Sequence, residues 1–148
     1  MIIRPIGVIH SPYITMENVP IQPCYSDHVG QVELFKRYEA GLKDVEGFSH
    51  IMILYLFHRS QGYSLTVKPF LDSNEHGVFA TRHPNRPNPI GVSVLTLLDR
   101  RGRLLRVKGI DVLDGTPLID VKPYVPDFDQ RADAKIGWLE GRVRTNQD

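Results

Sequence analysis

A proline-rich stretch near the middle of the chain places the firmest limit on the fold. Pro84, Pro87 and Pro89 lie close together, and each pushes the residue before it toward extended backbone geometry. The missing N–H donors exclude both a helix and a central strand in this stretch. Because β-prone residues flank it at 78–80 and 92–95, the pattern predicts a stiff loop between two strands.

The same loop carries polar side chains that a ligand could use. They are Arg82, Asn85, Arg86 and Asn88. A loop stiffened by proline has lost much of its chain entropy before a ligand binds, so such side chains are presented at little further ordering cost. Spacing alone leaves two interpretations open: a rigid turn with solvated arginines, or a site for an anion or another ligand.

Size, charge and cysteine content narrow the class of protein. The chain has 148 residues, which suits one domain with a moderate core. A formal net charge of +1 means that nucleic-acid binding would need local basic patches or a dimer. The single cysteine, Cys24, excludes an intramolecular disulfide and a cysteine-bound iron–sulfur cluster, and favours a cytoplasmic location. No signal-peptide pattern opens the sequence, and no apolar run reaches the ~20 residues that span a bilayer.

The strongest strand signal is the apolar run 48–58, in which both alternating faces carry large apolar residues. This is typical of a strand covered on both sides. His58 stands where the run stops, a place where a sheet displays functional groups, although a histidine satisfied by local contacts is an equal alternative. His50 would lie ~26 Å away in a straight strand, so the two histidines cannot share a metal ion.

Further elements are expected along the chain. We predict an edge strand at 2–9, a half-exposed strand at 31–35, short helical turns at 37–45, and a hairpin that joins 92–98 to 104–113 through Gly102. The tail 127–148 is polar except at 136–139, and we expect it to dock on the barrel through these residues.

Two groups of charged residues surround the expected hairpin. The densest basic cluster comprises Arg100, Arg101, Arg103, Arg106 and Lys108. Solvated loop charges are the usual explanation for such a cluster, and a phosphate-binding surface is the alternative. Asp111, Asp114 and Asp120 follow near a turn, close to Lys122 and Tyr124. Paired carboxylates can do acid–base chemistry, whereas Asp–Gly most often only makes the turn.

Missing motifs exclude several classes of enzyme. The sequence contains no G-x-G-x-x-G fingerprint and no G-x-x-x-x-G-K loop. Its six histidines form neither H-E-x-x-H nor H-x-H, so a dedicated zinc site is not expected. No G-x-S-x-G elbow occurs. Rossmann redox chemistry, P-loop phosphoryl transfer and zinc hydrolysis therefore all become poor candidates.

A set of motifs resembles the TsaA-like family, also called TrmO. The blocks are 5–13, 45–50 running into 57–58, 78–82, 86–91, 114–117 and 120–124, in the family's order. The resemblance implies an all-β fold, with a single closed or nearly closed β-barrel domain over 1–148, short helical insertions and an irregular tail. It also implies the short form of the family, without the additional C-terminal domain that long members carry.

The resemblance further implies an S-adenosylmethionine-dependent methyltransferase. Such a protein works as a homodimer with its ligand site near the subunit interface, and methylates N6 of threonylcarbamoyladenosine beside the tRNA anticodon. Carried over by motif, the residues that bind the donor would be Pro23, Cys24, His58, Arg59, Arg82, Val92, Gly109, Ile110 and Asp111. Arg82 is expected to pair with the methionyl carboxylate, and backbone groups of 109–111 to bind the adenine edge.

Roles toward the acceptor are less defined. Asp111, Asp114 and His58 are candidates for the proton acceptor, and the nucleotide would be held by Asn85, Arg86, Asn88, Lys122 and Tyr124. Two alternatives stay open. One is a methyltransferase of the same fold that acts on a small molecule or another RNA, and the other is a non-catalytic module that binds a ligand or RNA through the proline-rich loop.

Overall fold

The computed structural model describes residues 1–15, 17, 19–20 and 27–143, and these divide into two compact units. The barrel unit comprises 1–59 and 89–124, and the insertion unit comprises 60–88 together with the chain from 125 onward. Each unit is described by itself. Pro23 and Cys24 lie outside the described residues.

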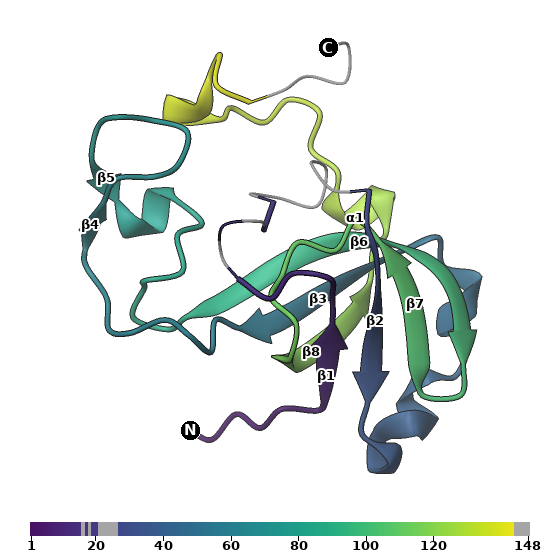
Figure 1. Cartoon of the computed structure of the whole chain (residues 1–148). Coiled ribbons are helices and arrows are strands. Elements are labelled where there is room, and N and C mark those ends of the chain that lie inside the picture. The colour runs from purple at the N-terminus through teal and green to yellow at the C-terminus, as the bar shows by residue number, and fades with distance from the viewer. Residues whose placement is uncertain (16, 18, 21–26, 144–148) are drawn as a thin grey trace. The chain divides into compact units, whose positions relative to one another are not determined.

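Six strands build the barrel unit: β1 (Gly7–His10), β2 (Val29–Leu34), β3 (His50–Leu56), β6 (Ile90–Arg101), β7 (Leu104–Lys108) and β8 (Thr116–Pro123). They form a closed barrel in the order β1-β2-β7-β6-β3-β8, with every neighbouring pair antiparallel (Figure 1). The predicted all-β barrel is confirmed. The predicted edge strand at 2–9 is wrong: β1 is shorter and pairs on both sides, since Gly7 lies opposite Leu34 and Leu118.

Strand β3 shows how the core is filled. Ile51 and Ile53 are fully buried in the barrel interior, whereas Met52 and Leu54 on the alternate face are only half-buried. Side chains alternate along a strand, so one face fills the barrel and the other forms its outer wall. We predicted that both faces of this strand are buried, and the structure confirms this in full only for the inner face.

The predicted hairpin forms between β6 and β7, with Gly102 at the turn in the left-handed region (φ +60°). β6 continues through Arg101, so the segment 99–101 that we expected in the turn is strand. The second strand is shorter than predicted, because β7 ends at Lys108 and not at 113. The expected helical turns are η3 (Lys36–Leu42) and η4 (Val45–Gly47), both 3₁₀. Arg100 donates from Nη1 to the carbonyl of Leu42 at 3.1 Å, which joins the hairpin to η3.

The insertion unit contains little regular structure. Its elements are β4 (Thr66–Val67), β5 (His76–Gly77), η5 (Val78–Ala80), α1 (Pro126–Asp129) and η6 (Gly137–Leu139). The β-prone run 78–80 that we expected as a strand is the 3₁₀ turn η5. β propensity depends on the pairing partner, and the β4–β5 pair ends at Gly77. Across the described residues, no helix is long and apolar enough to cross a membrane.

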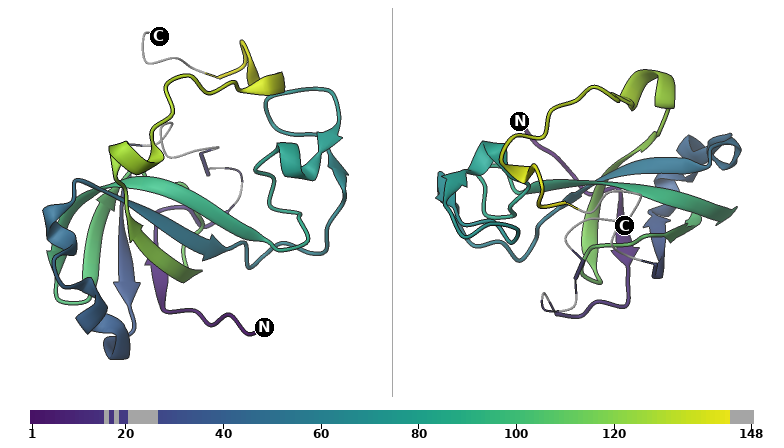
Figure 2. Two further views of the ribbon diagram at one scale, coloured as in Figure 1. Left: turned by 180° about the vertical axis from the view of Figure 1, so that it is seen from behind. Right: turned by 90° about the horizontal axis from the view of Figure 1, so that it is seen from above.

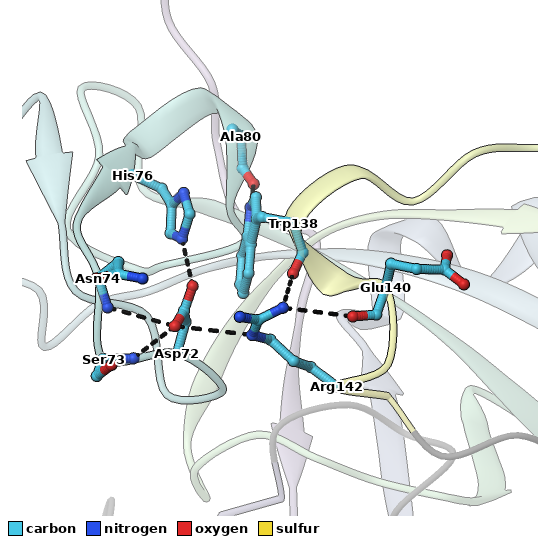
Figure 3. Close-up of polar contacts among 8 residues, drawn as sticks. All are labelled: Asp72, Ser73, Asn74, His76, Ala80, Trp138, Glu140 and Arg142. Carbon is cyan, nitrogen blue, oxygen red and sulfur yellow. Dashed lines mark hydrogen bonds and ion pairs between the residues drawn. The ribbon is translucent and has the colours of Figure 1, made fainter.

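Polar contacts join residues 138–142 to the segment 60–88 of the insertion unit, and η6 lies beside that segment in both views of Figure 2. Trp138 donates from Nε1 to the carbonyl of Ala80 at 2.8 Å and stacks on His76 with ring centroids 4.4 Å apart. Asp72 contacts both His76 and Arg142 in Figure 3. Its carboxylate oxygens are 2.8 Å from His76 Nε2 and 3.7 Å from Arg142 Nε. Its side chain is only 6% exposed. The hydrogen bond from His76 lowers the pKa of the Asp72 carboxyl below its usual value, against the opposing effect of burial.

Candidate functional site

One end of the barrel gathers most of the connections that the sequence singled out. Because neighbouring strands are antiparallel, the ends of β1, β3 and β7 lie beside the starts of β2, β6 and β8. The connections at this end are 11–28, 57–89 and 109–115. His58 and Arg59 follow β3 directly, and the segment 109–111 follows β7.

A buried carboxylate lies at this end. The exposed fraction is 6% for Asp111, 2% for Ser93 and 4% for Tyr55. Ser93 Oγ donates to Asp111 Oδ1 at 2.7 Å, and Tyr55 Oη lies 3.0 Å from Ser93 Oγ. Since a serine hydroxyl has one proton, the Tyr55 hydroxyl is the donor in the second bond. A chain of donors thus runs from Tyr55 through Ser93 to the carboxylate, which offsets part of the cost of burying it.

The turn that carries Asp111 is fixed by backbone contacts. Gly109 adopts a positive φ of 93°, which favours glycine, and its N–H donates to the carbonyl of His28 at 3.0 Å. Ile110, fully buried, donates to the same carbonyl at 3.4 Å. The predicted adenine-binding segment 109–111 is therefore held against the residue that precedes β2.

The second candidate carboxylate has a different environment. Asp114 Oδ1 accepts the N–H of Ser11 at 3.0 Å and lies 3.8 Å from His10 Nδ1. Its side chain is 50% exposed. Asp114 and Gly115, which has a φ of 81°, make the turn before β8. This agrees with the alternative that Asp–Gly serves only to form a turn. Of the two aspartates, only Asp111 combines burial with a chain of hydroxyl donors.

Other predicted residues are placed apart from Asp111. Val92 is 41% exposed and pairs with Leu54 on the outer wall. Lys122 and Tyr124 lie where β8 ends, at the far end of the barrel, roughly 23 Å of strand from its start at Thr116. The structure therefore does not bring Lys122 or Tyr124 together with Asp111 within one chain.

Side chains and backbone near the barrel end make local contacts. Arg59 Nη1 is 3.5 Å from the carbonyl of Ile14, and the backbone N–H of His58 donates to Leu56 at 2.8 Å. Tyr13 and His28 are joined by a 2.6 Å contact between Oη and Nδ1. The predicted donor contacts Pro23 and Cys24 fall in the connection between them, outside the described residues.

The proline-rich loop, whose residues 82–88 belong to the insertion unit, is held largely by its own atoms. Arg86 Nη1 donates to the carbonyls of Thr81 and His83 at 2.9 and 3.2 Å, and Ser60 Oγ donates to Asn85 Oδ1 at 2.8 Å. Burial, and then the charge of Arg86, lower the pKa of His83, whose Nδ1 accepts the Asn85 N–H as a neutral imidazole can. Arg86 and Asn85 thus stabilise the loop.

Two further residues of this loop, Arg82 and Asn88, are exposed. Neither Ser93 nor Tyr55 is among the site residues predicted from the sequence. A signal existed for Ser93, because it is the one hydroxyl among the inward residues Gly91, Ser93, Leu95 and Leu97 of β6. A polar group on an otherwise apolar inner face needs a partner, and that partner is Asp111.

Comparisons with known proteins agree with this architecture. Residues 8–130 match the family model described as the tRNA-methyltransferase O N-terminal domain. A crystal structure of TrmO from Pseudomonas aeruginosa superposes with a TM-score of 0.79 at 38% identity, covering 93% of this chain and 62% of that one.

Curated relatives divide into two kinds of name. A protein of Pyrococcus abyssi named as a probable S-adenosyl-L-methionine-binding protein is 53% identical over 95% of this chain and 77% of its own length. The tRNA (adenine(37)-N6)-methyltransferase of Escherichia coli is 38% identical over 91% of this chain, which spans 62% of that enzyme. With most of its length inside the matching model, the chain belongs to the family of the tRNA-methyltransferase O N-terminal domain.

Proposed function

We propose that this chain is an S-adenosylmethionine-dependent methyltransferase that methylates N6 of threonylcarbamoyladenosine next to the tRNA anticodon. The observation that carries the proposal is the buried carboxylate of Asp111 at the barrel end where His58 and Arg59 follow β3 and the segment 109–111 follows β7. Relatives named as S-adenosylmethionine-binding proteins and as tRNA (adenine(37)-N6)-methyltransferases support the donor and the acceptor, respectively.

The groups at the barrel end fit this donor. S-adenosylmethionine supplies a methyl group on a positively charged sulfonium. A buried carboxylate, a chain of hydroxyls and the buried side chain of Ile110 offer a cationic nucleoside both charge and apolar contact. The absence of a G-x-G fingerprint is compatible with this fold, because an all-β site does not use a helix N-terminus to hold its ligand.

Asp111 is our choice for the group that accepts the N6 proton. Asp114 is half exposed and its carboxylate already accepts the N–H of Ser11 in a turn. The Tyr55–Ser93 chain holds the Asp111 carboxylate in one orientation, as a proton acceptor requires. A carbamoyl substituent makes the N6–H more acidic, so a strong base is not required. The pairing of Arg82 with the methionyl carboxylate and the homodimer both stay predictions.

The test combines donor binding with methyl transfer. Isothermal titration of the purified chain with S-adenosylmethionine is followed by transfer of labelled methyl to tRNA with and without its threonylcarbamoyl group. Label on the modified tRNA alone supports the proposal. Donor binding without label on either tRNA would point to another acceptor. If the protein binds no donor, the non-catalytic module that binds a ligand or RNA is the alternative that remains.

A pair of isosteric variants tests the role of Asp111. Asp111→Asn should slow methyl transfer by about 10²-fold or more, the usual effect of losing a general base. Asp44→Asn is the matched control, because this aspartate is exposed in the turn before η4 and belongs to none of the predicted site residues. Equal activities of the two variants would remove Asp111 from the mechanism while leaving donor and acceptor open.

A further inference from the structure

A β-bulge redirects the side chains at the tip of the long hairpin. The register between β6 and β7 shifts between Leu97 and Asp99, which leaves Leu98 as the extra residue. Before the bulge, Leu95 and Leu97 face the barrel interior. After it, Arg100 lies opposite the buried Leu105, while Asp99 lies opposite Arg106. The bulge therefore moves Asp99 and Arg101 to the outer wall.

These redirected side chains line a hollow on the outer wall of β2, β7 and β6. Its volume is about 280 Å³, and it is lined by Gln31, Asp99, Arg101, Leu104 and Arg106. Only Leu104 among them is apolar. Two guanidinium groups and an amide thus supply hydrogen-bond donors, and the hollow carries a net positive charge.

Arg106 is held in one orientation by its neighbour. Its Nε and Nη2 both donate to Asp99 Oδ2, at 2.9 and 2.6 Å. A guanidinium is planar, so these two bonds fix the direction of its remaining N–H groups. The role of Asp99 in the hollow is to orient Arg106.

The other arginines of the hairpin are used differently. Arg100 donates from Nε to the carbonyl of Gly102 at 2.8 Å and pairs with Glu46 at 3.4 Å. Arg103 pairs with Glu33 at 3.4 Å. Lys108 follows Arg106 by two residues on the same outer face of β7, which extends the positive row beyond the hollow. The structure thus separates the basic cluster into arginines that stabilise the hairpin and a row that faces outward.

We propose that the hollow of Arg101 and Arg106 binds phosphate groups of an RNA backbone and forms a docking surface on the outer wall of the barrel. The proposal rests on the proposed function, which requires a tRNA. Planar guanidinium groups match phosphate oxygens in geometry and charge, so the two arginines of the hollow suit contacts to a phosphate backbone.

The experiment compares two variants that each remove one positive charge from the same hairpin. Arg101→Ala changes the hollow, and Arg103→Ala removes an arginine that lies outside it and pairs with Glu33. Binding of threonylcarbamoyl-modified tRNA is measured by fluorescence anisotropy between about 50 and 200 mM salt. Arg101→Ala should bind about tenfold more weakly, the size of one charge-assisted hydrogen bond. The slope of the logarithm of its binding constant against the logarithm of the salt concentration should fall by about one in magnitude. The affinity and slope of Arg103→Ala should stay near those of the wild type.

The remaining outcomes overturn the inference. Equal losses in the two variants would show that overall charge, and not the hollow, attracts RNA. Displacement of the tRNA by polyglutamate as readily as by unlabelled tRNA would assign the hollow to acidic polypeptides. Donor titration and methyl transfer keep the two proposals distinct. If the wild-type protein binds donor and methylates tRNA, and Arg101→Ala binds tRNA as tightly as the wild type does, only the docking surface is disproved. If the wild-type protein binds no tRNA, the docking surface is disproved directly. Transfer of labelled methyl from S-adenosylmethionine then tests the proposed function separately.

Discussion

The two units of this chain are stabilised by different physics. In the barrel unit, apolar side chains from all six strands fill one interior, and many of them are fully buried. In the insertion unit, Val67, Pro69 and Val78 are the buried apolar residues among those described, and polar contacts around Asp72 and Trp138 join its segments. Burial of apolar area is insensitive to pH, whereas a carboxylate that pairs with histidine and arginine is not. The two units should therefore respond to different perturbations.

The largest effect is expected from a cavity in the barrel. Ile53→Ala removes a fully buried side chain from β3 and should cost about 2–5 kcal/mol of unfolding free energy. Chemical denaturation followed by far-UV circular dichroism measures this loss. The fluorescence of Trp138, the only tryptophan, reports on the insertion unit in the same samples. Identical midpoint shifts in both signals would contradict the separation of the two units.

A smaller loss is expected from the buried hydroxyl chain. Tyr55→Phe leaves Ser93 Oγ without the donor that it accepts from, which should cost about 1–3 kcal/mol. Tyr63→Phe is the control, because Tyr63 is 62% exposed. If both variants unfold at the same denaturant concentration, the hydrogen bond from Tyr55 to Ser93 contributes nothing to the barrel's stability. Its role is then limited to positioning Asp111.

Acid should loosen the insertion unit before the barrel. The pKa of Asp72 is lowered in the folded chain, so its contribution to stability is present above the usual pKa of 3.8 and is lost as the pH falls through the lowered value. Trp138 fluorescence should therefore change below about pH 4, while circular dichroism of the barrel changes less. Asp72→Asn should abolish this acid step. An unchanged step in that variant would assign it to another carboxyl group.

The smallest effect is expected from an exposed ion pair of the barrel. Glu46→Gln removes the partner of Arg100, whose guanidinium keeps its contacts to the carbonyls of Leu42 and Gly102. Exposed ion pairs contribute little to stability, so the unfolding midpoint should not move measurably. A clear decrease would mean that the barrel also depends on surface charge, which weakens the contrast between the units.

Local patterns predicted most of the strands. The apolar run around β3 and the Gly102 turn were visible because alternation and turn chemistry are properties of short segments. Closure of the barrel was anticipated from family motifs alone. The β1–β8 pairing depends on contacts between Gly7 and Leu118, which no local pattern encodes.

The candidate site was predictable in part. Asp111 was identified as a residue near a turn, but its partner Ser93 lies 18 residues earlier and is reached only through the β6–β7 pairing. The bulge at Leu98 also escaped prediction, although two consecutive leucines where the alternation should continue are a signal for it. Without the bulge, the outward position of Arg101 could not be inferred.

Closure of the barrel through β1 and β8 has a consequence for synthesis of the chain. The seam joins Gly7 to Leu118, so the first strand of the barrel to be made must wait for the barrel's last strand. At typical rates of translation, the wait is several seconds and up to about 20 s. During that time β1 and β2 can pair with each other but β1 keeps an open edge, which is a template for pairing with other chains. The nascent protein is therefore most exposed to aggregation just before β8 leaves the ribosome.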